Sequence, residues 1–184
     1  MCRLFGMTAG NAQVHATYWL ETAPDSMATQ SHRNPDGTGI GWFDIAGDPH
    51  LTKQAAPAAD DPRFRAEATA VDATTIVTHV RAATTGRNSV VNTHPFLIEN
   101  RIMAHNGGFS DLAAVNEQLG DYRRFVKGDT DSERYAALIA QQTDLNGGDV
   151  GEGLAAAARW LSESVPMYSL NTVVATAGHV WALR

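Results

Sequence analysis

The sequence predicts an α+β fold, in which strands lie early and late in the chain and helices lie between them. Strand-like segments occupy residues 3–8, 40–45 and 75–80, and two more lie near the C-terminal end. Helical periodicity is clearest between residues 112 and 161. Separate runs of strands and helices are typical of a layered α+β domain. A chain of 184 residues suits one domain, which we expect to span 1–184.

Each strand prediction depends on a short apolar or β-branched run. Residues 3–8 directly follow Cys2, residues 40–45 contain an aromatic pair, and residues 75–80 are β-branched. Residues 101–105 lead into Asn106-Gly107, a strong turn signal, so we expect that strand to end there. Residues 171–176 and 179–183 flank Ala177-Gly178, which predicts a tight hairpin.

Three helices are predicted from apolar residues spaced three and four apart. Positions 112, 115 and 119 share one face, with Ser110 placed to cap the helix and Gly120 to end it. Thr130 and Glu133 have the spacing of a capping box at the start of a second helix. Apolar residues at 150, 154, 157 and 161 mark a third. Residues 54–75, rich in Ala, Asp and Pro, predict a loop with one short helix near 65–71.

Composition and charge exclude several classes of protein. Hydrophobic residues make up 43% and charged residues 18%, which is a foldable, globular composition. The net charge is −6 and Lys and Arg are not clustered, so we expect neither nucleic acid nor a membrane as partner. No secretory signal is visible, and we expect a cytoplasmic protein. The strand-like run that ends at Arg184 predicts a natural chain that continues beyond it.

The single cysteine, Cys2, follows the initiator Met1. One cysteine excludes an internal disulfide and a multi-thiolate metal site. Removal of Met1 would leave a free α-amine on the residue that carries the thiol, and an α-amine has a pKa of roughly 7.7–8.0. Such an amine can accept the thiol proton and later deliver it to a leaving group. The alternative is a structural cysteine at the start of a strand, with Met1 retained.

Other motifs place polar groups near predicted strand and helix ends. Gly37, Gly39 and Gly41 alternate before an apolar strand, which predicts close backbone approach and a tight turn. Arg81 ends a strand and offers a bidentate fork to a carboxylate, although a surface salt bridge is the commoner use. Asn106 supplies a side-chain amide beside the Gly107 backbone N–H, which is either an oxyanion hole or a simple turn.

Asp131 lies in the first turn of a predicted helix, within the segment Thr130-Asp131-Ser132-Glu133. A carboxylate there is favoured by the helix dipole in any protein, so capping alone would explain it. The functional alternative is a carboxylate that faces the α-ammonium group of an amino-acid substrate.

Taken together and in this order, the motifs resemble the class II glutamine amidotransferases, whose glutaminase domains use an N-terminal cysteine. The matching segments are Cys2, HRNPDGTGIGW, THVRAATTG, NTHPF, AHNGG and TDSE, and they run from residue 2 to about residue 135. The resemblance implies a four-layer αββα sandwich of the N-terminal-nucleophile hydrolase type. Asn34 departs from the Gly that the large synthases carry in this motif, which argues against identity with any one of them.

The resemblance also implies a role for each matching residue. Cys2 corresponds to the nucleophile, and Asn106 and Gly107 to the oxyanion hole. Arg81 corresponds to the residue that holds the substrate α-carboxylate, and Asp131 to the partner of its α-amine. Thr84 and His94 lie in motifs that line the pocket.

The reaction expected is hydrolysis of the side-chain amide of glutamine or a γ-glutamyl compound through a Cys2 thioester, with release of ammonia or an amine. A chain of 184 residues cannot hold the acceptor domain of the large synthases, so the resemblance is to stand-alone members. The partners expected are therefore a glutamine or γ-glutamyl small molecule and, for ammonia transfer, a separate synthase subunit. No cofactor is expected.

Three alternatives remain open at this point. The chain could hydrolyse another amide through the same cysteine, or it could be a regulatory binding domain that keeps the pocket and retains Met1. A metal site would need His79, His94 and His105, but their separations of 15 and 11 residues match no zinc motif. We therefore expect no metal, and expect His79 and His105 to be hydrogen-bonded structural residues.

Overall fold

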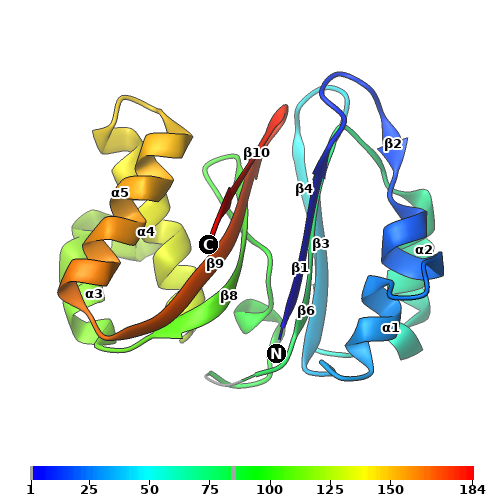
Figure 1. Cartoon of the computed structure of the whole chain (residues 1–184), viewed down its shortest axis with the longest axis horizontal. Coiled ribbons are helices and arrows are strands. Elements are labelled where there is room, and N and C mark those ends of the chain that lie inside the picture. Colours follow the sequence, from blue (N-terminus) through cyan, green and yellow to red (C-terminus); the bar gives the residue numbers. More distant parts are fainter. Residues whose placement is uncertain (1, 84–85) are drawn as a thin grey trace.

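The computed structural model describes residues 2–83 and 86–184, and its two main sheets pack face to face between two layers of helices (Figure 1). The first sheet has the antiparallel order β1-β6-β3-β4 and the second the order β10-β9-β8-β7. The strands are β1 (Arg3–Thr8), β3 (Gly37–Phe43), β4 (Pro49–Gln54), β6 (Thr75–Arg81), β7 (Phe96–Ile98), β8 (Arg101–Phe109), β9 (Met167–Thr176) and β10 (His179–Leu183). The short β2 (Val14–His15) and β5 (Asp72–Ala73) pair separately. This arrangement confirms the predicted αββα sandwich.

Helices cover the outer face of each sheet (Figure 1). The first sheet carries α1 (Met27–Ser31), α2 (Pro62–Ala70) and the short turns η1 (Tyr18–Thr22) and η2 (Ala58–Asp60). The second carries α3 (Leu112–Leu119), α4 (Asp131–Leu145) and α5 (Val150–Ser164), with η4 (Gly120–Phe125) joining α3 to α4 and η3 (Val90–Asn92) preceding β7. None of the helices in the described ranges has the length and apolar character needed to cross a bilayer.

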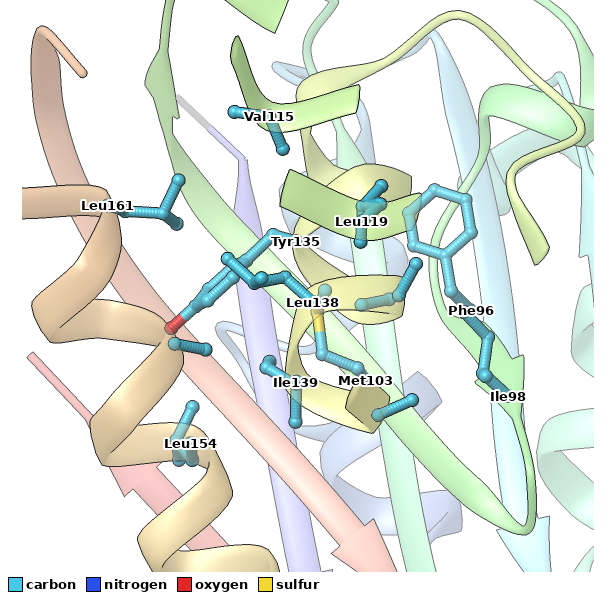
Figure 2. Packing of buried hydrophobic residues seen from close by; sticks show 14 of the residues in the cluster. Phe96, Ile98, Met103, Val115, Leu119, Tyr135, Leu138, Ile139, Leu154 and Leu161 are labelled. Carbon is cyan, nitrogen blue, oxygen red and sulfur yellow. The ribbon is translucent and has the colours of Figure 1, made fainter. Parts of the chain in front are cut away.

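The largest apolar core lies between α3, α4, α5 and the second sheet (Figure 2). Tyr135, Leu138 and Ile139 of α4 are fully or almost fully buried, because α4 is covered by helices as well as by the sheet. Gly153 of α5 faces Thr143 of α4, where an added Cβ would lie 2.6 Å from the Thr143 Cα. The missing side chain lets the two helices approach closely.

Close packing between the sheets depends on the alternating glycines of β3. Residues two apart in a strand share one face, and this face of β3 lies against Ile102 of β8 and against the segment His94-Pro95 before β7. An added Cβ at Gly39 would lie 2.2 Å from the His94 carbonyl oxygen, and one at Gly41 would lie 2.8 Å from Ile102. The predicted close approach is confirmed, but these glycines lie in the strand and not in a tight turn.

The expected turn at Asn106-Gly107 is wrong. Strand β8 continues to Phe109, with Asn106 opposite Asn171 and Gly107 opposite Leu170 of β9. The local turn signal is overridden because β9, distant in sequence, supplies hydrogen-bonding partners along the whole strand. Strand β9 also begins before the predicted residue 171, whereas the hairpin to β10 is as predicted.

Some helix caps and helix starts also differ from those predicted from the sequence. Helix α3 is capped by Asp111, whose carboxylate accepts from the Ala114 N–H at 3.3 Å, and not by Ser110. Helix α2 begins at Pro62, earlier than predicted, since Asp61 provides its N-cap. Thr130 caps α4 as expected, but the Glu133 carboxylate accepts from the Gly128 N–H at 2.6 Å instead of completing a capping box.

Candidate functional site

Cys2 lies just before β1, beside the end of β6. The register of the two strands places Arg3 opposite Val80, so Cys2 adjoins Arg81 and Ala82. The half-buried Cys2 Sγ accepts from the Ala82 N–H at 3.2 Å and lies 3.4 Å from the Ala82 carbonyl oxygen. A main-chain N–H directed at the sulfur is suited to stabilise negative charge on it.

The sulfur opens into a small pocket between the two sheets, where six residues predicted from sequence come together. These six are Cys2, Arg81, His94, Asn106, Gly107 and Asp131. Thr84, the remaining predicted residue, lies outside the described residues. Four further residues line the pocket: Ala82, His105, Thr130 and Ser132.

Opposite charges occupy the pocket wall. Arg81, at the end of β6, is 4% exposed, and its Nη1 lies 3.5 Å from the Arg87 carbonyl oxygen. Asp131, the first residue of α4, is 6% exposed and accepts from the Phe109 N–H at 3.3 Å. The N-terminal end of a helix favours a carboxylate. A zwitterionic ligand would therefore find a cation for its carboxylate and an anion for its ammonium group.

Asn106 joins the second sheet to the nucleophile candidate. Its side-chain amide donates to the Cys2 main-chain carbonyl oxygen at 3.0 Å. The main-chain carbonyl oxygen of Asn106 accepts from Asn171 Nδ2 at 2.9 Å. At Gly107 an added Cβ would lie 1.8 Å from the Ser169 carbonyl oxygen, so a side chain there is excluded without backbone movement. The Asn106 amide and the Gly107 backbone are thus held beside Cys2 by β9.

His105 belongs to a polar network behind the pocket. Its Nδ1 lies 3.0 Å from Ser132 Oγ, which in turn lies 3.4 Å from an Asp131 carboxylate oxygen, and its Nε2 lies 3.4 Å from the Ser169 carbonyl oxygen. Burial lowers the pKa of His105, while the Asp131 charge opposes that shift. His105 is the hydrogen-bonded structural histidine that the sequence predicts, and the network fixes the position of Asp131.

His79 and His94 form a second buried pair, with ring centroids 4.2 Å apart. Among the described residues neither ring has a hydrogen-bond partner, so the expected hydrogen bond to His79 is wrong. Burial lowers the pKa of His79 to about 3 and that of His94 well below its ordinary value, so both rings are neutral. Within residues 2–83 and 86–184, no group of three or more His, Cys, Asp or Glu side chains is arranged to hold a metal ion.

Ala82 and Ser132 belong to the site but were not predicted from the sequence, for different reasons. Ala82 acts through its backbone N–H and carbonyl, so no side-chain pattern marks it. Ser132 lies in the TDSE motif, but only its contacts with His105 and Asp131 show its place in the network.

Comparisons with known proteins agree on one family. The family described as glutamine amidotransferases class-II matches residues 1–184. A probable glutamine amidotransferase of Saccharomyces cerevisiae, DUG3, is 28% identical over 170 residues, covering 81% of this chain and 47% of its own. The γ-glutamyl-hercynylcysteine sulfoxide hydrolase of Mycobacterium tuberculosis is 34% identical over 117 residues, covering 58% of this chain and 49% of its own. The chain spans about half the length of these curated relatives.

A solved structure gives the same result. The glutamine aminotransferase class-II domain protein of Silicibacter pomeroyi superposes with a TM-score of 0.61 at 27% identity, covering 81% of this chain and 68% of that chain. The family match over residues 1–184 and this structural likeness agree with the fold described above. The chain belongs to the class II glutamine amidotransferases.

Proposed function

We propose that this protein hydrolyses the side-chain amide of glutamine or of a γ-glutamyl compound, with Cys2 as nucleophile after removal of Met1. One observation carries the proposal: the Cys2 sulfur, the paired charges of Arg81 and Asp131, and the Asn106 amide line one pocket. This set matches the two ends of a glutamyl group, an amino-acid head and a side-chain amide.

The charged residues orient the substrate. Arg81 receives the α-carboxylate and Asp131 the α-ammonium group, and both side chains are buried enough for these ion pairs to be strong. Holding the head in this way fixes the position of the γ-carbonyl carbon relative to Cys2 Sγ. Positioning of this kind converts binding energy into rate.

The reaction then proceeds in two displacement steps, the formation of a Cys2 thioester and its hydrolysis. The Cys2 Sγ–carbon bond forms, the carbon–nitrogen bond breaks, and the thiol proton reaches the departing nitrogen through the Cys2 α-amine. Water then adds to the thioester, the carbon–sulfur bond breaks, and the thiol regains a proton as glutamate leaves. The Asn106 amide and the Gly107 N–H stabilise the oxyanion in both steps.

The proposal is tested by the intact mass of the native protein after exposure to 6-diazo-5-oxo-norleucine, a glutamine-like electrophile. We expect a parent mass that lacks Met1 and one added label, which is absent in Cys2→Ala. Retained Met1 without a label would contradict the catalytic proposal and favour a binding domain. A processed protein that resists this label but reacts with simple acyl-amides would favour hydrolysis of another amide.

We propose that the released ammonia or amine leaves into solvent, ahead of the alternative in which ammonia is transferred to a separate synthase subunit. The name of the mycobacterial relative, a hydrolase of a γ-glutamyl compound, supports this order. Steady release of glutamate by the purified chain alone is the expected result. Release that appears only when a second subunit is added would instead support ammonia transfer.

A further inference from the structure

A buried asparagine connects the two chain segments that carry the charged residues of the Cys2 pocket. Asn92 is the last residue of η3 and is 2% exposed. It begins the NTHPF motif, in which His94 lines the pocket, but Asn92 is not one of the residues that line it. Any influence of Asn92 on a ligand in the pocket therefore acts through the residues that it contacts.

Both donors and the acceptor of the Asn92 side-chain amide are used. Its Nδ2 donates to the main-chain carbonyl oxygen of Arg87 at 2.9 Å and to Oδ1 of Asp129 at 2.5 Å. Its Oδ1 accepts from the Asp129 N–H at 3.1 Å. An ionised carboxylate in this place could only accept hydrogen bonds, so it could not make the two donations.

One of these bonds leads to Arg81. The Arg87 carbonyl oxygen that accepts from Asn92 also lies 3.5 Å from Nη1 of Arg81. The Arg87 side chain is exposed, so its main chain, and not its own charge, is what faces the pocket. Asn92 thus holds a main-chain oxygen against the guanidinium group to which we assign the α-carboxylate of the substrate.

The other two bonds lead to Asp131. Asp129 lies two residues before it, and Thr130 between them is the N-cap of α4. Asn92 holds Asp129 by its main-chain N–H and by its carboxylate, which fixes the path of the chain into α4. The packing is tight, since an added Cβ at Gly128 would lie 2.2 Å from Asn92 Oδ1. A shift of Asp129 would reach the Asp131 carboxylate through a single residue.

The two charged residues belong to different layers of the fold, since Arg81 ends β6 and Asp131 begins α4. An amino-acid head carries its carboxylate and its ammonium group on one carbon atom. A pocket that binds both groups must therefore hold its own two charges at a fixed separation. The Asn92 amide contacts both supporting segments, one through Arg87 and the other through Asp129.

We propose that Asn92 is a positioning residue that sets the separation of Arg81 and Asp131, and thereby makes the pocket selective for a head that carries both charges. This inference rests on the proposed function, which assigns the amino-acid head to these two residues. It adds a determinant of specificity that lies outside the pocket and touches neither the substrate nor Cys2.

The experiment measures by calorimetry the dissociation constants of glutamate, glutarate and 4-aminobutyrate. Glutarate lacks the α-amine of glutamate and 4-aminobutyrate lacks its α-carboxylate, so the ratio of each Kd to that of glutamate reports one contact. Each ratio should be at least about tenfold in the unaltered protein, equivalent to about 1.4 kcal/mol, and should fall towards one in Asn92→Ala and in Asn92→Asp. Asn88→Asp, at an exposed position of the same segment, is the matched control and should keep both ratios.

An exchange of partners separates positioning from a general loss of structure. In Asn92→Asp the new carboxylate faces that of Asp129, whereas Asn92→Asp combined with Asp129→Asn again lets an amide donate to a carboxylate. The glutarate ratio should recover in this double variant, because the anchor of α4 is restored. The 4-aminobutyrate ratio should stay low, because the Arg87 carbonyl oxygen still lacks its donor. Asp129→Asn alone should keep both ratios, since its amide oxygen still accepts from Asn92.

Unchanged ratios in Asn92→Ala and Asn92→Asp overturn the inference. Two ratios that fall and recover together, or a glutarate ratio that stays low in a double variant with native circular dichroism, overturn it as well. Failure of the proposed function looks different. Ratios near one in the unaltered protein show that Arg81 and Asp131 do not hold the head, which removes this inference too, whereas missing glutamate release and missing label on Cys2 contradict the hydrolysis while the ratios are still measurable.

Discussion

The side-chain amide of Asn106 donates a hydrogen bond to the main-chain carbonyl oxygen of Cys2, 3.0 Å away and 104 positions earlier in the chain. The bond connects β8 in one sheet with the start of β1 in the other. It fixes the amide against Cys2 in the pocket that both residues line, and the main-chain carbonyl oxygen of Asn106 accepts from Asn171 on β9. The oxyanion role that we propose for this amide requires a donor that is held in place before the substrate arrives.

Replacement of Asn106 by alanine should reduce turnover of glutamine about 10²–10³-fold, because one oxyanion donor is lost. Steady-state kinetics measure the effect, and circular dichroism checks the fold. Asn146→Ala, at the exposed C-terminal end of α4, is the control and should retain full activity. Normal turnover in Asn106→Ala would exclude the assigned role.

Substitution of Asp131 by asparagine keeps the shape of the side chain but removes its charge. We expect the KM for glutamine to rise by about tenfold or more, equivalent to at least about 1.4 kcal/mol, because the α-ammonium group loses its partner. The value of kcat should change less, since the role proposed for Asp131 is to bind the amino-acid head and not the reacting carbonyl. Asp121→Asn, on exposed η4, should leave both constants unchanged. An unchanged KM in Asp131→Asn would contradict the assignment.

Alanine at Gly39 should destabilise the protein by forcing the sheets apart. The added Cβ would lie 2.2 Å from the His94 carbonyl oxygen, which is a main-chain atom and cannot rotate away. Overpacking of this kind costs about 1–3 kcal/mol, measured as a fall in the free energy of unfolding in urea. Gly178→Ala, where an added Cβ meets no atom within 4 Å, should change stability little. Equal stability of the two variants would show that the sheets are not in close contact at Gly39.

Stability should fall as the pH is lowered from 7.5 towards 5. His79 has its pKa lowered to about 3 by burial, whereas a histidine in an unfolded chain has a pKa of about 6.5. Between these two pKa values the unfolded chain binds a proton at His79 that the folded protein does not bind. The contribution of neutral, buried His79 to stability is therefore complete above about pH 6.5 and declines below it. For His79 alone the loss at pH 5 is about 2 kcal/mol, and His94 acts in the same direction.

Urea unfolding at both pH values measures this effect, with His79→Leu as the diagnostic variant. Its stability should depend less on pH, by about 2 kcal/mol over this interval. His179→Gln, an exposed residue of β10, should show the same pH dependence as the unaltered protein. If His79→Leu also does so, the histidine titrates normally in the folded state.

Local sequence patterns determined a large part of the fold. The β-branched run of β6, the apolar spacing of α5 and the hairpin at Ala177-Gly178 are all encoded by neighbouring residues. The αββα layering was predicted from the ordered motifs that resemble a known family. The hydrophobic periodicity of the sequence predicted only an α+β domain. Strands β4 and β7 were not predicted, because their short mixed sequences acquire strand structure only through pairing with β3 and β8.

The sequence by itself determined which residue types serve the pocket: one cysteine at position 2, and Arg81, Asn106, Gly107 and Asp131 in recognisable motifs. Only the tertiary structure decided that Asn106 and Gly107 lie in a strand, that Ala82 donates to the sulfur through its backbone, and that Arg81 and Asp131 line one pocket. Local rules cannot supply these facts, because each depends on a partner far away in the chain. Pairing between strands, exclusion of side chains at a close contact and burial of charge are all properties of the packed sheets.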